Sequence, residues 1–199
     1  YRPDALDVDP RLGITSLTFL FTDLKGSTEL YERVGDLQAY DLVKAHFRTL
    51  HEVVAMNAGA VVKTIGDAVM ATFPTPDRAV GAALRMREAM RELNSERGHE
   101  DLVLKIGIHE GPCLAVTFND RLDYFGQTVN IAARVQALAT SSSIFATRCV
   151  VDHPAAARVL GDSGYEPVAR KMALRGIAGE VAVYEIPWDK PAAGETSRA

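Results

Sequence analysis

The sequence has little cysteine, no long apolar run and no block of basic residues, and each absence excludes a class of protein. The 199 residues include 2 cysteines, Cys113 and Cys149, which is too few for a disulfide framework and fits a reducing cytoplasm, where we expect the chain to work. No uninterrupted apolar run reaches the ~20 residues of a membrane-spanning helix. The formal net charge is −4, so we expect neither nucleic acid nor an anionic membrane as the main partner.

The composition that remains is that of one ordinary globular domain. Apolar residues make up 47% of the chain and charged residues 24%, which allows a sizeable buried core. Acidic residues and prolines in residues 1–10 predict an extended lead-in, and the polar residues 188–199 predict a disordered tail. The folded domain is expected over residues 11–187. Because the chain begins with Tyr1 rather than Met, we expect it to be part of a longer protein with regulatory domains outside this segment.

Apolar periodicity predicts strands that alternate with helices. A strand over about Ser16–Asp23 precedes a helix that follows Gly35-Asp36. Residues 60–73 predict a β-hairpin, and Thr75-Pro76-Asp77 begins a second helix. This order predicts an α/β fold (an α+β sandwich) with a ferredoxin-like βαββαβ core and extra C-terminal strands. The apolar face of the first helix is predicted to consist of Leu37, Tyr40, Val43, Phe47, Leu50 and Val54; further strands are expected over 102–109 and 113–117, and a helix from near Gly126.

The stretch TFLFTDLKGST, residues 18–28, ends an apolar run on an acidic side chain, Asp23. A carboxylate at a strand end either caps a turn or binds a ligand, and the stretch alone favours neither. Gly26, Ser27 and Thr28 predict the start of a helix whose free N–H groups can bind phosphate. The same three residue types are common in loops, so phosphate binding stays a hypothesis at this point.

Two charged residues interrupt the predicted hairpin. Asp67 occupies the turn with Gly66, where aspartate is common for structural reasons alone. Lys63 lies in a strand that is otherwise expected to be buried on both sides, so its ammonium must reach the surface or meet an acceptor. Asp23 and Asp67 both end secondary elements and together can hold one or two divalent ions such as Mg²⁺. Two bound metals suit an in-line phosphoryl displacement.

The segment DYFGQTVNIAAR, residues 123–134, carries a further polar set. Asn130 and Arg134 lie four residues apart on the predicted helix and share a face, which either contacts solvent or faces a ligand. An arginine there can stabilise charge that develops on a phosphoryl group. Lys63 and Asp123 supply a donor and an acceptor, which match the ring nitrogen and the exocyclic amine of adenine; guanine presents the reverse pattern.

With these motifs in this order, the chain resembles the catalytic domain of the class III nucleotide cyclases, the adenylyl and guanylyl cyclases. FTDLKGST resembles the first metal motif of the family, KTIGD the second and DYFGQTVNIAAR the third. The resemblance extends over about residues 15–187, so we interpret 11–187 as this domain. It implies the following roles: Asp23, Asp67 and the Leu24 carbonyl as ligands of two divalent ions, Mg²⁺ or Mn²⁺; Lys63 and Asp123 as the base-reading pair; Asn130 as the ribose-orienting residue; Arg134 as the transition-state residue; and Arg175, with Gly26, Ser27 and Thr28, beside the triphosphate.

The resemblance also implies an activity and an assembly. We expect an adenylyl cyclase that converts ATP to 3′,5′-cyclic AMP and pyrophosphate, in two equivalent sites shared across a homodimer. In the family the metal carboxylates come from one chain and the lysine, asparagine and arginine from the other. The alternatives are a guanylyl or mixed-specificity cyclase and a silent module that binds ATP without turnover. Lys25 departs from the acidic or apolar residue of many relatives, and we expect it to face solvent.

Overall fold

The structure, a computed structural model, describes residues 13–97, 102–118, 121–139, 143–174 and 180–188. Three predicted features lie outside the described residues: the lead-in over 1–10, the phosphate ligand Arg175, and the tail that follows Trp188. The helices and strands are β1 Gly13–Lys25, α1 Ser27–Val34, α2 Asp36–Met56, β2 Ala60–Ile65, β3 Ala68–Phe73, α3 Pro76–Arg97, β4 Val103–Phe118, β5 Arg121–Phe125, α4 Gln127–Leu138, β6 Ile144–Thr147, α5 Arg148–Val151, α6 Pro154–Asp162, β7 Val168–Ala173 and β8 Glu180–Ile186.

The strands of the described residues form one sheet in the order β2-β3-β1-β4-β6-β8-β7, with β5 paired to β4. The first four positions are antiparallel throughout and are connected as β1-α2-β2-β3-α3-β4, with α1 inserted after β1. This is the predicted ferredoxin-like βαββαβ core. β6 then adds in parallel to β4, and β8 and β7 continue antiparallel, which confirms the extra C-terminal strands.

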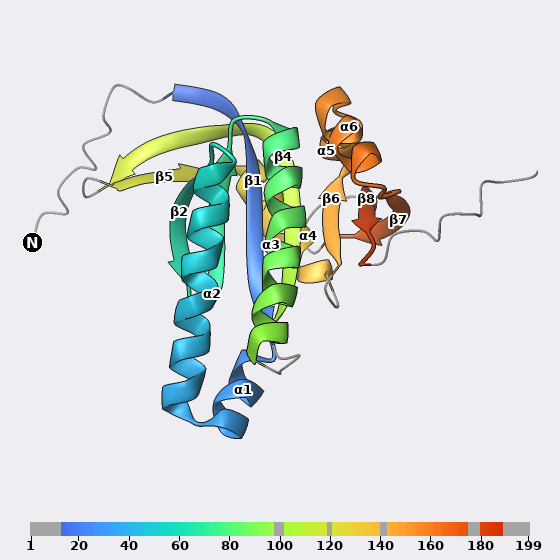
Figure 1. Ribbon diagram of the computed structural model, residues 1–199. Coiled ribbons are helices and arrows are strands. Elements are labelled where there is room, and N and C mark those ends of the chain that lie inside the picture. The colour runs from blue at the N-terminus through green and yellow to red at the C-terminus, as the bar shows by residue number, and fades with distance from the viewer. Residues whose placement is uncertain (1–12, 98–101, 119–120, 140–142, 175–179, 189–199) are drawn as a thin grey trace, which may run out of the picture.

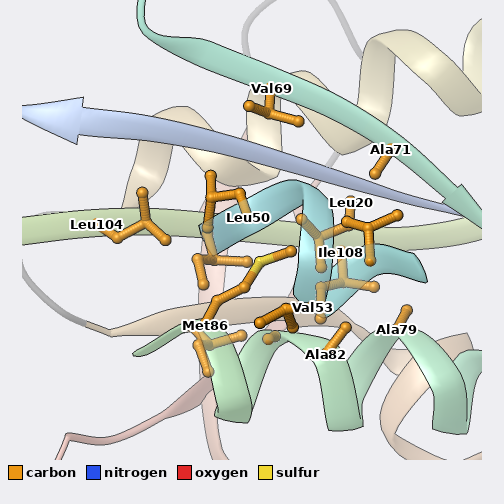
Figure 2. Packing of buried hydrophobic residues seen from close by; sticks show 14 of the residues in the cluster. Leu20, Leu50, Val53, Val69, Ala71, Ala79, Ala82, Met86, Leu104 and Ile108 are labelled. Carbon is orange, nitrogen blue, oxygen red and sulfur yellow. The ribbon is translucent and has the colours of Figure 1, made fainter. Parts of the chain in front are cut away.

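The helices cover the two faces of the sheet unequally. α2 and α3 lie side by side across one face, and α4 lies behind the sheet and packs on β1 and β4 (Figure 1). The main core lies between the sheet and α2 and α3, where Leu20, Ile108 and Met86 are fully buried (Figure 2). A second, smaller cluster around Phe19 and Ala132 lies on the α4 face. Burial of such side chains contributes about 1.5–3 kcal/mol each, which makes the sheet a firm support for polar groups at its ends.

The predicted apolar face of α2 is wrong at its N-terminal end. Leu37 and Tyr40 are exposed, at 76% and 57%. The prediction counted large apolar side chains, whereas this helix packs through small ones as well, which allow it to approach the sheet closely. The buried residues of α2 are Ala39, Leu42, Ala45, His46, Leu50, Val53 and Val54.

Two further predictions need correction. The strands expected over 102–109 and 113–117 are one continuous strand, β4, which pairs with β1 from Val103 to Ala115. The short helices α5 and α6, of 4 and 9 residues, were not predicted, because such brief helices give little periodic signal in a sequence. Among the described helices, none combines the length and the apolar character that a membrane crossing requires.

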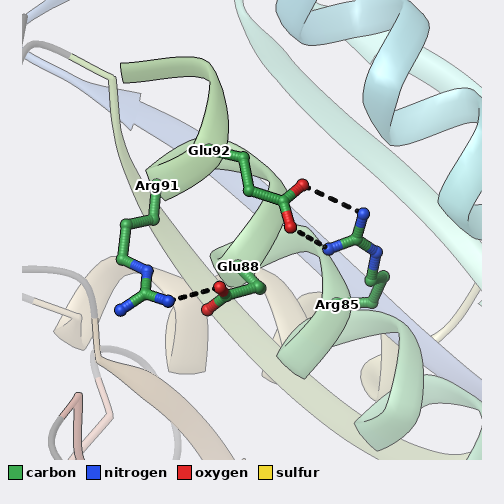
Figure 3. Close-up of polar contacts among 4 residues, drawn as sticks. All are labelled: Arg85, Glu88, Arg91 and Glu92. Atoms are coloured by element: carbon green, nitrogen blue, oxygen red, sulfur yellow. Dashed lines mark hydrogen bonds and ion pairs between the residues drawn. The ribbon is translucent and has the colours of Figure 1, made fainter. Parts of the chain in front are cut away.

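The outward face of α3 is solvated and carries ion pairs (Figure 3). Arg85 donates to both oxygens of Glu92, at 3.0 and 3.1 Å, and Arg91 pairs with Glu88 one turn away. All four side chains are exposed, so solvent screens both pairs and they add little to stability. We assign this face a solubilising role.

Candidate active site

Strand β1 holds Asp23 at the end of the sheet. Leu24, its neighbour, is buried in the main core, while Asp23 is half-buried on the other side of the strand. Lys105 lies directly across on β4, and its Nζ is 3.7 Å from Asp23 Oδ2. Lys105 was not predicted, because nothing in the local sequence shows which residue of a distant strand will face Asp23.

Asp67 lies in the turn between β2 and β3, beside Gly66. Gly66 has φ 62, a left-handed conformation that favours glycine, so the turn depends on it. Asp67 Oδ2 is buried and has no hydrogen-bond partner among the described residues. A buried carboxylate oxygen without a partner is costly, which marks it as a position for a ligand that the polypeptide itself does not supply.

The two carboxylates influence each other. Burial raises the pKa of Asp23 above its usual value, and the negative charge of Asp67 raises it further, against the opposing effects of Lys105 and the Leu24 N–H. A divalent cation would remove both unfavourable effects and would fill the orphaned position at Asp67. The described residues contain no cluster of three or more His, Cys, Asp or Glu side chains suited to a metal. Two neighbouring carboxylates suit a hard ion such as Mg²⁺, which would need further oxygen ligands to complete its coordination.

One further buried polar residue, His46, was not predicted to belong to a functional site. His46 on α2 is fully buried, and neither ring nitrogen has a hydrogen-bond partner of good geometry in the described part of the chain. Burial lowers its pKa to about 4, and the backbone and carboxylate of Asp67 oppose that shift.

Lys63 and Asp123 meet in space although they are 60 residues apart. Lys63 Nζ donates to Asp123 Oδ2 at 2.6 Å, and the Tyr124 N–H donates to Asp123 Oδ1 at 2.8 Å. Partial burial raises the pKa of Asp123, but these hydrogen bonds and the charge of Lys63 outweigh it and hold the pKa below its usual value. The charged form of Asp123 is therefore favoured, and the contact with Lys63 is already formed within one chain.

The expectation that the strand of Lys63 is buried on both sides is wrong. β2 is the edge strand of the sheet, and the Lys63 side chain is 42% exposed. A β-bulge sets its direction: Val61 pairs with Ala71 and Lys63 with Met70, which leaves Val62 as an extra residue. Val61 packs in the main core while Val62 packs in the cluster on the α4 face. The extra residue therefore turns Lys63 toward the face that carries β5 and Asp123.

Helix α4 presents Asn130 and Arg134 away from its own sheet. Its buried residues are Thr128, Ala132 and Val135, and Asn130 is exposed while Arg134 is half-buried on the other side of the helix. Within the described residues, neither side chain makes a hydrogen bond or an ion pair with Asp23, Asp67, Lys63 or Asp123. One chain thus brings its polar residues together as two separate pairs and leaves the α4 residues facing outward.

The docking of α4 depends on two glycines of β4. A Cβ on Gly107 would lie 2.1 Å from the Gln136 backbone nitrogen, and one on Gly111 would lie 2.7 Å from Thr128 Oγ1. Thr128 Oγ1 also donates to the Pro112 carbonyl at 2.6 Å. These contacts fix the position of the helix that carries Asn130 and Arg134.

We expect Gly107→Ala to displace α4, because the backbone of Gln136 cannot move away independently of the helix. Overpacking of this kind costs about 1–3 kcal/mol. The expected result is a thermal midpoint several degrees lower, with lost activity in the fraction that still folds. Gly161→Ala is the matched control, since a Cβ there meets nothing within 4 Å. Equal midpoints for the two variants, by calorimetry, would contradict the close packing of α4.

The remaining predicted residues have simpler positions. Gly26 precedes α1, which begins at Ser27, so the predicted helix start is confirmed; the side chains of Ser27 and Thr28 are not described. Lys25 is exposed, as expected.

The ferredoxin-like sheet, with a carboxylate pair at one end and a lysine–aspartate pair on the α4 face, has the arrangement expected of a class III nucleotide cyclase. The chain belongs to that family, since residues 12–186 match the adenylate and guanylate cyclase catalytic domain. An adenylate cyclase from Mycosarcoma maydis is 34% identical over 165 residues, which cover 73% of this chain and 6% of that protein. The guanylate cyclase soluble subunit beta-2 of Homo sapiens is 28% identical over 165 residues, which cover 78% of this chain and 26% of that protein.

The crystal structure of the adenylyl cyclase CyaB from P. aeruginosa shares the fold, with a TM-score of 0.77 at 20% identity over 89% of this chain and 96% of that one. The relatives thus include cyclases of both base specificities. The chain spans only a small part, 6% and 26%, of the two cyclases named above from Mycosarcoma maydis and Homo sapiens.

Proposed function

We propose that this domain is an adenylyl cyclase, which converts ATP to 3′,5′-cyclic AMP and pyrophosphate. The observation that carries the proposal is the 2.6 Å contact between Lys63 and Asp123. Lys63 offers a donor for the adenine ring nitrogen, and Asp123 offers an acceptor for the exocyclic amine. Guanine has a ring N–H and a carbonyl at those two positions, which would face a donor with a donor and an acceptor with an acceptor.

The carboxylates of Asp23 and Asp67, with the Leu24 carbonyl, would hold two divalent ions, Mg²⁺ or Mn²⁺. The unpartnered Asp67 Oδ2 supports this assignment. When bound, such ions make the ribose 3′-hydroxyl a better nucleophile and neutralise the phosphates. The oxygen of that hydroxyl forms a bond to the α-phosphorus, the bond to the pyrophosphate oxygen breaks, and the hydroxyl proton leaves to solvent or to substrate.

The other residues of the proposal bind and orient the nucleotide. Asn130 would orient the ribose, and Arg134 would stabilise the charge that develops on the α-phosphoryl group. The backbone at Gly26, Ser27 and Thr28, where α1 begins, would lie beside the triphosphate, which suits the free N–H groups of a helix start. Arg175 is proposed as a further phosphate ligand.

We infer a homodimer in which each site takes Asp23 and Asp67 from one chain and Lys63, Asp123, Asn130 and Arg134 from its partner. The support is that Asn130 and Arg134 project from α4 away from their own sheet and do not meet the carboxylates of the same chain. Further domains in the longer protein, as in the much longer relatives, would regulate this assembly.

The base specificity is tested by comparing ATP with GTP as substrates of the purified chain, with Mg²⁺ and with Mn²⁺. We expect cyclic AMP to be the main product and kcat/KM for ATP to exceed that for GTP by at least about 100-fold, because a mismatched base leaves both Lys63 and Asp123 unpaired. A preference for GTP would contradict the assignment of this pair. Binding of ATP without turnover in both metals would identify a silent nucleotide-binding module instead.

A further inference from the structure

A cysteine and a histidine lie together outside the two polar pairs of the candidate active site. Cys149 Sγ is 3.6 Å from His109 Nδ1 and 3.5 Å from the Glu110 carbonyl oxygen. His109 belongs to β4 and Cys149 to α5, so the fold joins two segments that are 40 residues apart. Cys149 is an exposed free thiol, which a small solute can reach. Nothing in the proposed cyclase reaction uses this group of donor atoms.

The spacing of these three atoms is that of neighbouring ligands on one soft metal ion. With a metal–sulfur distance of about 2.3 Å and a metal–nitrogen distance of about 2.0–2.1 Å, a tetrahedral Zn²⁺ ion holds these two ligands about 3.6 Å apart. An oxygen ligand at about 2.1 Å from the ion lies nearly as far from the sulfur. The observed separations of 3.6 and 3.5 Å agree with both. As hydrogen bonds the same contacts would be weak, because a thiol is a poor donor.

The histidine is in the protonation state that a metal ion requires. Burial lowers the pKa of His109 to about 4, so the ring is neutral at neutral pH and one of its nitrogens carries no proton. The Thr147 hydroxyl oxygen lies 2.7 Å from Nδ1 and 3.2 Å from Cys149 Sγ, which orients both groups. Because a hydroxyl proton rotates about its bond, Thr147 can release Nδ1 to an ion while its oxygen stays beside it.

We propose that Cys149, His109 and the Glu110 carbonyl form a binding site for a thiophilic cation such as Zn²⁺ or Cd²⁺. On binding, the Cys149 thiol gives its proton to solvent as the metal–sulfur bond forms, and water completes the coordination. Sulfur and imidazole prefer such ions, whereas the carboxylates of Asp23 and Asp67 suit hard ions such as Mg²⁺. The site therefore differs in chemistry from the proposed catalytic metal site and does not depend on it.

The proposed site lies on the part of β4 that supports α4. His109 pairs with Phe19, whose side chain belongs to the cluster on the α4 face. It also lies between Gly107 and Gly111, the two residues of β4 against which α4 packs closely. A bound ion would thus link the start of α5 to the strand on which α4 rests.

The experiment titrates Cd²⁺ into the purified chain and follows the ultraviolet charge-transfer absorption of a cadmium–thiolate bond. We expect this absorption to be lost in Cys149→Ser and kept in Cys113→Ser. Cys113 is the matched control because it is buried and its thiol donates to the Thr15 carbonyl. An excess of Mg²⁺ should leave the absorption unchanged.

His109→Gln keeps the thiol and removes the imidazole. We expect the affinity for Cd²⁺ to fall at least tenfold, because loss of a direct ligand should cost no less than loss of an outer-shell partner, which costs about 10–100-fold. If this variant fails to fold, protection from alkylation replaces it. Zn²⁺ should then slow the reaction of Cys149 with iodoacetamide at a concentration that leaves the cysteine of a short unstructured peptide unprotected.

Three results would overturn the proposal. Absorption that survives in Cys149→Ser, or that Mg²⁺ abolishes, places the ion elsewhere. Equal affinity in His109→Gln and the unchanged chain, or equal protection of Cys149 and the peptide, leaves only an isolated thiol. None of these measurements uses cyclase activity, so they stand or fall separately from the proposed function.

Discussion

Mixing Asp67→Ala chains with Arg134→Ala chains is expected to restore about one quarter of the unchanged activity, although each variant alone is inactive. Arg134→Ala removes a group that would stabilise the transition state, and loss of one such group costs about 100- to 1,000-fold in kcat. Asp67→Ala removes a proposed metal ligand. In a mixed dimer one site carries both defects and the other carries neither. Random pairing makes half of the dimers mixed, each with one working site of two. The measurement is cyclic AMP production after the two variants are mixed and allowed to exchange chains.

The control uses two defects on the same side of the proposed site. Asp23→Ala mixed with Asp67→Ala should give no recovery, because in the mixed dimer each site still lacks one carboxylate. Recovery in this control, or its absence in the first mixture when mass spectrometry shows that mixed dimers have formed, would contradict a site shared between chains.

Exchanging the charges of Lys63 and Asp123 is expected to invert the base preference. The double variant Lys63→Glu with Asp123→Lys keeps an ion pair where the two side chains now meet at 2.6 Å. It reverses the donor and the acceptor, so the pattern matches the ring N–H and carbonyl of guanine. We expect kcat/KM for ATP to fall by about 10⁴-fold, the scale set by leaving both polar groups of a site unpaired, and GTP to become the better substrate. Initial rates with each nucleotide give the ratio directly.

A single variant and a remote variant show whether the donor–acceptor pattern, rather than the change of charge, determines the base preference. Lys63→Glu alone places two carboxylates together and should impair both nucleotides, since like charges repel and raise the pKa values of both groups. Lys171→Glu makes the same change on the exposed strand β7 and should leave the ATP to GTP ratio unaltered. An unchanged preference in the double variant would mean that the base is read elsewhere.

The parts of the site that follow from local sequence were predictable. An apolar run that ends on Asp23 predicts a strand that carries a carboxylate at its end, and the Gly66-Asp67 turn predicts the β2–β3 hairpin. Both are confirmed by the structure, together with the βαββαβ core. Each signal lies within about ten residues, the range over which periodicity and turn chemistry act.

The parts that depend on sheet order were not predictable. Lys63 was expected in a buried strand because its neighbours are apolar, yet β2 lies at the edge, and strand order is decided by contacts far apart in sequence. The same holds for Lys105, which faces Asp23 only through the β1–β4 register.

The bulge at Val62 makes recognition of the base depend on chain length rather than on residue identity alone. Strand neighbours alternate between faces, so one residue more or fewer before Lys63 exchanges the face on which the lysine emerges. A relative that kept every polar residue of this site but lacked the extra position would carry its lysine toward the helices α2 and α3. Insertions and deletions in β2 are therefore a route by which such a domain could lose or change its nucleotide without any substitution at a functional residue.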